Sequence, residues 1–299
     1  GLISAKSAPI IFVLLWSTGF TGIKYGIPYA PPFTFIAIRM AIAAALLAII
    51  ALAITKRFVS DLQTIGKSAL IGLTIHGAYL GGCFYGVKQG MPAGITALIC
   101  SLQPVLVSIA SARFFGEKLS PRKIAGLTLG LLGLILVITP RLEVASTDSL
   151  PVDGVFAVCI ALLGGTIGTL LQKKYGGEIE VLSGTSWQYF ATFLLMASLA
   201  FFFEDGESVT WNFSFIAALL WLTVALSIGA ILVLYYLLAR SSAASVSSLY
   251  YLVPAVTAVE AYFLFGETIS MLTAIGSAIT IIGVAIVLSG GKALRSQSG

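Results

Sequence analysis

The chain has 299 residues, of which 58% are hydrophobic and only 10% are charged, and its mean hydropathy is +1.03. This composition excludes a soluble globular domain, whose surface would need more charge, and it indicates that lipid is the solvent. A net charge of +5 would suit nucleic acid, but the cations lie in short loops between apolar runs, so we expect no nucleic-acid partner.

Ten apolar runs, each long enough to cross a bilayer, follow one another with short loops between them. They cover residues 8–28, 33–54, 68–88, 92–114, 121–140, 152–172, 182–203, 216–238, 242–264 and 270–290. The longest polar connection, residues 141–153, separates the first five runs from the last five. The sequence therefore predicts an all-α membrane protein with ten transmembrane helices.

A duplication relates the two halves of the chain. Residues 97–137 and 247–287 are copies of one segment, 150 positions apart, in which Pro104 matches Pro254. A unit with an odd number of spans must enter the bilayer in opposite orientations in its two copies, an architecture typical of transporters. We therefore expect two inverted five-helix repeats, residues 1–145 and 150–299.

The distribution of Lys and Arg predicts the orientation of the chain. With a cytoplasmic N-terminus, thirteen of the 17 basic residues lie on the inner side and four on the outer side, and the acidic residues lean the other way. We therefore expect a multi-pass protein of the bacterial inner (plasma) membrane, with both termini cytoplasmic.

Small residues mark the places where helices can approach closely. Gly19 and Gly22 do so in the first span, where they suit a helix that must slide or rock. Glycines repeat in the fifth and tenth spans at Gly126, Gly133, Gly276 and Gly283. The sequence leaves open whether these two spans form a scaffold within one chain or a dimer contact, and a monomer is the simpler expectation.

Pro104 and Pro254 lie near the middle of the fourth and ninth spans. A proline inside a helix has no N–H to donate, and its ring pushes against the carbonyl four residues earlier. A carbonyl freed in this way is costly in hydrocarbon unless protein or a water-lined cavity satisfies it. Two symmetric, central kinks therefore favour a shared central cavity over two ordinary packed prolines.

Aromatic and polar side chains gather at the same depth as the two prolines. On the third span, the spacing of His76, Tyr79 and Cys83 places them on one face of the helix. The candidate substrate-binding residues are Trp16, His76, Tyr79, Cys83, Ser101, Thr166, Trp187 and Tyr251. Aromatic rings interleaved with hydroxyls and one imidazole suit an amphipathic organic solute better than an ion.

Two ionisable groups within the spans have alternative interpretations. His76 is either a neutral imidazole bonded to a neighbouring helix or a group that handles a ligand or a proton. Glu260 either faces an outer vestibule or pairs with Arg39 or Lys24. The three cysteines show no metal-binding spacing and only one histidine is present, so we expect no metal and no cofactor.

In these features the chain resembles the drug/metabolite transporter superfamily, in its ten-span form with two EamA-type repeats. The resemblance covers nearly the whole chain. It rests on Trp16-Ser17, Lys24-Tyr25-Gly26, Arg39, and the series Pro104, Gly116-Glu117, Gly126 and Gly133 with its copy at Pro254, Gly266-Glu267, Gly276 and Gly283. The second repeat departs from the usual pattern at Thr166, which stands in place of tryptophan.

Within that family the chain is most similar to the YddG type of aromatic amino acid exporter. The resemblance implies a substrate cavity between the two halves and export by alternating access. A phosphorylated-metabolite or nucleotide-sugar carrier is the nearest alternative, but the outer Lys24, Arg39 and Lys88 suit it poorly. A membrane enzyme is the alternative from a different class, and the sequence lacks the paired carboxylates or clustered metal ligands that it would need.

Overall fold

The computed structural model describes residues 4–144 and 150–293, and all the regular structure in those ranges is helical. Ten helical stretches are long and apolar enough to span a membrane, which confirms the predicted fold class. Several spans are divided into shorter elements. The elements are α1 (Ala8–Gly26), η1 (Ile27–Tyr29), α2 (Pro32–Thr55), α3 (Leu62–Gly72), η2 (Leu73–Ala78), α4 (Tyr79–Lys88), α5 (Ala93–Cys100), α6 (Gln103–Phe114), α7 (Pro121–Val144), α8 (Val152–Tyr175), η3 (Gly176–Glu178), α9 (Val181–Phe203), α10 (Phe213–Trp221), η4 (Leu222–Ala230), α11 (Ile231–Arg240), α12 (Ala243–Ser248), η5 (Leu249–Leu252), α13 (Val253–Phe265) and α14 (Met271–Ala293).

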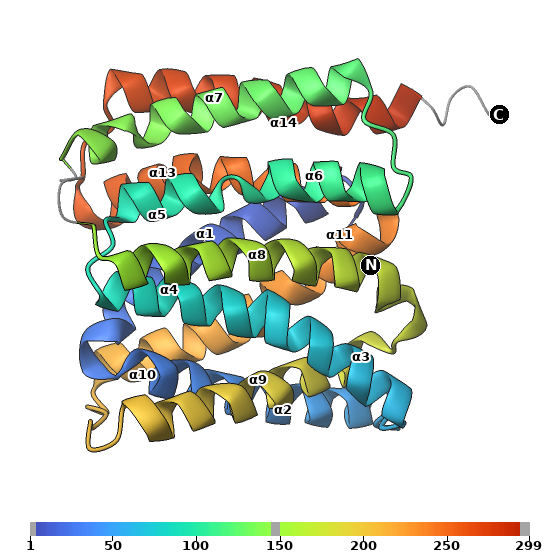
Figure 1. The fold of residues 1–299 in the computed structure, drawn as a ribbon, viewed down its shortest axis with the longest axis vertical. Coiled ribbons are helices and arrows are strands. Elements are labelled where there is room, and N and C mark those ends of the chain that lie inside the picture. The colour runs from blue at the N-terminus through green and yellow to red at the C-terminus, as the bar shows by residue number, and fades with distance from the viewer. Residues whose placement is uncertain (1–3, 145–149, 294–299) are drawn as a thin grey trace.

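The spans alternate in direction along one bundle (Figure 1). There α1 runs from right to left and α8 from left to right, so the first helices of the two halves are antiparallel. The helix before the central connection ends at Val144 and the next begins at Val152. The predicted boundary of the first repeat, residue 145, lies outside the described residues.

Corresponding helices of the two halves pack against each other. The α7–α14 pair forms one edge of the bundle and the α2–α9 pair the opposite edge (Figure 1). Between these pairs, α8 packs on η2 and α4, and α1 packs in the same way on α10, η4 and α11. Large apolar side chains, among them Ile49, Phe202 and Phe263, cover the outside of the bundle, as a lipid solvent requires.

The α7–α14 pair is held together by close backbone contact within one chain. A Cβ atom added to Gly133 would lie 2.5 Å from the Thr280 nitrogen, and one added to Gly283 would lie 2.4 Å from the Gly130 nitrogen. Only glycine leaves room for backbones at this separation. Of the two alternatives that the sequence left open for the fifth and tenth spans, the structure shows a helix pair within one chain.

The prolines stand at breaks in the fourth and ninth spans, but not in the way that the sequence predicts. They do not kink a continuous helix. The fourth span stops at a turn over Ser101 and Leu102, and the ninth passes through the 3₁₀ turn η5, after which α6 and α13 begin with Pro104 and Pro254 in their first turns. The missing N–H costs nothing there, since first-turn amides have no partner within the helix.

The third and eighth spans contain π-helical turns at equivalent positions. η2 and η4 each widen the helix, and η4 includes residues 223–228, which lie 150 positions after those of η2. Such turns are rare and occur often at functional sites. Gly19 and Gly22 of α1 face η4, where an added Cβ would come within 3.3 Å of Leu226 and 2.9 Å of Leu222. The smooth face of α1 therefore lies directly against the irregular part of the eighth span.

Candidate functional site

A group of aromatic rings lies where α1 passes the broken spans. The Trp16 ring centroid lies 6.2 Å from that of Tyr79 and 5.5 Å from that of Tyr250, which it meets edge-on. Phe12 completes the group, 5.5 Å from Trp16 and 5.6 Å from Tyr250. Phe12 is fully buried, but Trp16, Tyr79 and Tyr250 are only half-buried. We call Trp16, Tyr79 and Tyr250 the central cluster.

The tyrosine that reaches this cluster is not the predicted one. Tyr251 is buried on the other side of the span, where its ring lies 2.7 Å from the position of a Cβ on Gly130 of α7. Its hydroxyl is buried without a hydrogen-bond partner. Tyr250, and not Tyr251, therefore lies beside Trp16, because neighbouring residues in a helical turn point about 100° apart.

The remaining predicted residues divide between this cluster and other places. Cys83 lies one turn beyond Tyr79, with its thiol beside that of Cys100 from α5, and Tyr79 lies near both. Ser101 and Thr166 instead donate their hydroxyls to carbonyls of their own helices, at 2.5 and 2.7 Å. The hydroxyl proton of each residue thus already has an acceptor in its own helix. The two side chains contribute more to the shape of the site than to its hydrogen bonding.

Trp187 lies apart from the central cluster. Its indole nitrogen donates to the Val59 carbonyl at 2.9 Å, and its ring packs on Phe58 and Phe190. Val59 belongs to the loop between α2 and α3, so Trp187 fastens that loop to α9. None of these contacts is with another of the predicted substrate-binding residues.

His76 belongs to a buried hydrogen-bond network. Its Nε2 atom lies 3.0 Å from Oε1 of Gln188 and 3.2 Å from the hydroxyl of Tyr235. Tyr235 also donates to Gln188 at 2.5 Å, and Gln188 donates to Gln172 at 3.2 Å. The network joins η2, α8, α9 and α11. A buried, hydrogen-bonded group of this kind fixes how helices meet, which favours the structural interpretation of His76.

A second buried polar group adjoins this network through the ring of Tyr189, whose centroid lies 4.6 Å from that of His76. The Tyr189 hydroxyl donates to the Ser227 carbonyl, and Nε of Arg39 donates to the Ser227 hydroxyl at 2.8 Å. Arg39 is only 6% exposed. It therefore ties α2 to the π turn η4 and does not pair with Glu260.

Gln103 is a polar neighbour of Tyr79 that the sequence analysis misses. It is buried in the first turn of α6, and its Oε1 atom would lie 2.5 Å from a Cβ on Gly165, a position that is also 3.3 Å from the Tyr79 ring. Within the described residues its amide makes no side-chain hydrogen bond. The signal in the sequence was a glutamine, a large polar residue, directly before the central proline of a membrane span.

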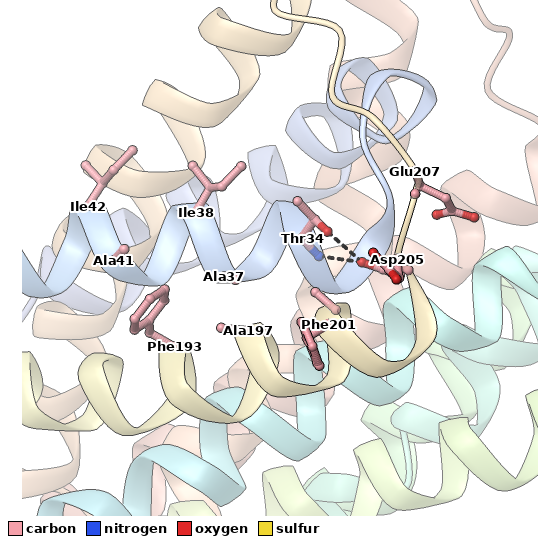
Figure 2. A pocket seen from close by; sticks show the side chains of 13 residues that line it. Thr34, Ala37, Ile38, Ala41, Ile42, Phe193, Ala197, Phe201, Asp205 and Glu207 are labelled. Atoms are coloured by element: carbon pink, nitrogen blue, oxygen red, sulfur yellow. Dashed lines mark hydrogen bonds between the residues drawn. The ribbon is translucent and has the colours of Figure 1, made fainter.

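Two cavities lie away from the central cluster. A groove of about 510 Å³ runs between α2 and α9. Its floor is apolar, with Ala37, Phe193 and Ala197 among the side chains that line it (Figure 2). Glu204 also lines the groove, and its carboxylate accepts hydrogen bonds from the backbone and hydroxyl of Thr34 at 2.7 and 2.8 Å. The other cavity, of about 460 Å³, lies between α1, α10 and α13 and contains Glu260.

The charged groups show few pairings. Within the described residues, the ion pairs are Lys67 with Glu178 and Lys88 with Glu207, the latter at 3.6 Å. Lys24 lies over the Phe265 ring, 4.7 Å from its centroid. Neither pairing considered for Glu260 is therefore formed. In residues 4–144 and 150–293, no three His, Cys, Asp or Glu side chains are grouped so that they could hold a metal ion.

Comparison with known proteins decides the family. The EamA-like transporter family matches residues 5–139 and again residues 153–289. The chain belongs to the EamA-like transporter family. As a family member with ten apolar spans, it is a multi-pass membrane transporter.

Individual relatives of this transporter are distant but cover its full length. It is 25% identical to the uncharacterized transporter YvbV of Bacillus subtilis, over 96% of this chain and 92% of YvbV. It is also 25% identical to a protein of Salmonella typhimurium named "Probable amino-acid metabolite efflux pump", over 96% of this chain and 95% of that protein. A solved structure with 21% identity shares the fold, with a TM-score of 0.81 over 97% of this chain and 99% of the other.

Proposed function

We propose that this transporter exports amino acids or related small metabolites with an aromatic or hydrophobic part. The observation that carries the proposal is the central cluster, in which three half-buried rings from separate spans meet at the helix breaks. The similar Salmonella protein, named as an amino-acid metabolite efflux pump, supports the same class of substrate.

The chemistry of the cluster suits such a substrate. The faces of Trp16, Tyr79 and Tyr250 would stack on its apolar part. Within the described residues, neither the Tyr79 nor the Tyr250 hydroxyl has a hydrogen-bond partner, so both are free to bind a polar group of the substrate. The Gln103 amide, beside Tyr79, adds a donor and an acceptor.

Transport would proceed by alternating access, with the two inverted repeats, residues 1–145 and 150–299, moving against each other. The glycine face of α1 against η4, and the breaks before Pro104 and Pro254, are the places where such a motion would cost least. The excess of basic residues in the predicted inner loops supports cytoplasmic termini in the plasma membrane.

The test is transport of labelled amino acids by the purified protein in vesicles, with and without a proton gradient. We expect aromatic amino acids to be transported best, and Tyr250→Ala to reduce their transport at least tenfold. Tyr251→Phe is the matched control, because this neighbouring ring packs on α7 and should leave transport unchanged. Equal transport by wild type and Tyr250→Ala would remove the cluster from the substrate path.

Arg39 gives one specific reason to include anions in the same panel. It is a buried cation within a span, and Nε is the only one of its nitrogens with a hydrogen bond among the described residues. Phosphorylated metabolites would be the substrates of a carrier that uses it. Preferred transport of these over amino acids, lost in Arg39→Gln, would replace amino acid export as the function.

A further inference from the structure

The cavity between α1, α10 and α13 has the properties of a binding site of its own. It lies at the end of the bundle opposite to the start of α1, since the residues of α1 that line it belong to the last turns of that helix. Its walls carry hydroxyls and aromatic rings together with one acid. The polar and aromatic lining residues are Thr18, Thr21, Tyr25, Phe213, Ser214, Trp221 and Glu260.

The carboxylate of Glu260 is the unexplained group in this cavity. Its Oε2 atom is buried and has no hydrogen-bond partner, although it lies within a membrane span. The equivalent position in the first repeat is Ala110, so the fold of the repeat does not require an acid here. An unpaired acid is costly within a membrane, and it persists where a ligand or an ion pathway uses it.

Part of the cavity wall is held in place by hydrogen bonds that do not involve the acid. The indole nitrogen of Trp221 donates to the Thr18 hydroxyl at 2.8 Å, and that hydroxyl donates to the Leu15 carbonyl at 2.6 Å. The Trp221 ring is therefore fixed in the wall without using Glu260. Trp221 and Tyr25 remain 46% and 47% exposed, so the cavity is open to a ligand on one side.

We propose that this cavity binds an organic ammonium ion, with Glu260 as its counter-charge. A primary ammonium group would pair with the Glu260 carboxylate, and the rings of Trp221 and Tyr25 would hold the attached apolar part. The volume of about 460 Å³ suits a small amine. A metal cation fits poorly, because Glu260 is the only acid that lines the cavity. The inference rests on this cavity alone and does not depend on the proposed export.

The test uses two probes with the same ring and opposite charge, 2-phenylethylamine and 3-phenylpropionate. Their binding to the full-length protein is measured by equilibrium dialysis in lipid discs made only of phosphatidylglycerol, which has no ammonium group. We expect the amine to bind and the acid not to bind. Glu260→Gln should weaken amine binding at least tenfold, whereas Glu267→Gln, which removes the same charge from an exposed hairpin, should not.

Further measurements separate this site from the central cluster and from a proton site. Glu260→Gln keeps the shape of the side chain, and an unchanged melting temperature in detergent would show that lost binding is not lost folding. Amine binding that survives Glu260→Gln but is lost in Tyr79→Ala would place the ligand in the central cluster and overturn the proposal. Glu260→Gln that abolishes transport driven by a pH gradient without changing amine affinity would make the carboxylate a proton site and also overturn it.

The ammonium group has two possible sources, and lipid composition distinguishes them. Phosphatidylethanolamine added to the discs should compete with 2-phenylethylamine if the natural ligand is a lipid headgroup. An unchanged amine affinity in its presence would assign the site to free amines. Both results retain the ammonium site, whereas equal binding of the amine and the acid to wild type would refute it.

Discussion

The two halves of this transporter share a backbone but differ in side chains at the centre. Both have a π turn in the third span of the repeat and a break before the proline in the fourth. Yet Tyr79 corresponds to Gly229, and Cys100 corresponds to Tyr250. The duplication therefore supplied a symmetric frame, and the central cluster was built into it with different residues from each copy.

The exchange of large and small residues continues at the helix contacts. Tyr79 packs against Gly165 of α8, whereas in the other half Gly229 lies beside Leu15 of α1, which is the equivalent of Gly165. Each contact thus pairs one large residue with one glycine. In the first contact the large residue belongs to the third span of a repeat, and in the second it belongs to the first span. Both contacts are therefore filled from the first repeat, by the aromatic ring of Tyr79 in one and by the aliphatic side chain of Leu15 in the other, and the glycines of the second repeat leave the room.

We expect folding to be lost to the same extent when either repeat is altered at the close contact between α7 and α14. Gly133→Leu and Gly283→Leu each place a side chain inside the backbone of the partner helix, so we expect almost no folded protein from either. Size-exclusion chromatography of the detergent extract measures this. Gly66→Ala is the control, because nothing lies within 4 Å of its added Cβ. A normal yield from only one of the leucine variants would show that the frame is not symmetric.

The central cluster, in contrast, should respond in one copy only. Tyr79→Ala removes a ring from the cluster, and we expect a ten- to hundredfold loss of amino acid transport, about 1.4 to 2.7 kcal/mol of binding. Gly229→Ala should cost less than twofold, since its Cβ would lie 3.5 Å from Leu15, an ordinary contact. Initial rates in vesicles measure both. Equal losses in the two variants would mean that the two copies contribute equally.

Tyr235 and its repeat equivalent Tyr85 offer a comparison of stability. Tyr235 donates to buried Gln188, whereas Tyr85 donates to Asp153 at 3.1 Å in an exposed position. Tyr235→Phe should therefore cost about 1–3 kcal/mol, because it leaves a buried acceptor short of a partner. Tyr85→Phe should cost less, because water can replace its exposed hydrogen bond. Apparent melting temperatures in detergent rank the two, and a larger drop for Tyr85→Phe would contradict the burial argument.

The smallest effect concerns the first turns of α2 and α9, which occupy equivalent positions but have different caps. Glu204 caps α2 from the end of α9, whereas α9 has its own N-cap in Glu180. Partial burial would raise the pKa of Glu180, but hydrogen bonds from Ser183 and Leu182 outweigh it and the pKa is lowered. We expect Glu180→Ala to cost about 0.5–1 kcal/mol at pH 7.

The pH dependence of this cap has a definite sign. A carboxylate with a lowered folded pKa stabilises the protein fully above its unfolded pKa of about 4.3 and loses that effect as the pH falls through the folded value. The difference in melting temperature between wild type and Glu180→Ala should therefore shrink from pH 7 to pH 3. A difference that grows on acidification would contradict the assignment.

The sequence by itself determined the ten spans, the duplication and the glycines that allow close helix contact in the fifth and tenth spans. It also placed glycine at positions 116 and 266, where the backbone is left-handed at φ +66° and +65°. These features depend on local composition and backbone sterics, which a linear pattern records.

Only the tertiary structure decided that Tyr250 and not Tyr251 reaches Trp16, that Gln103 lies beside Tyr79, and that His76 is bonded to Gln188. A side chain's direction depends on the rotation of its helix, and the π and 3₁₀ turns of these spans change that rotation by an amount that no local pattern records. The packing of neighbouring helices sets it, and so the face that each span turns to the centre is a property of the whole bundle.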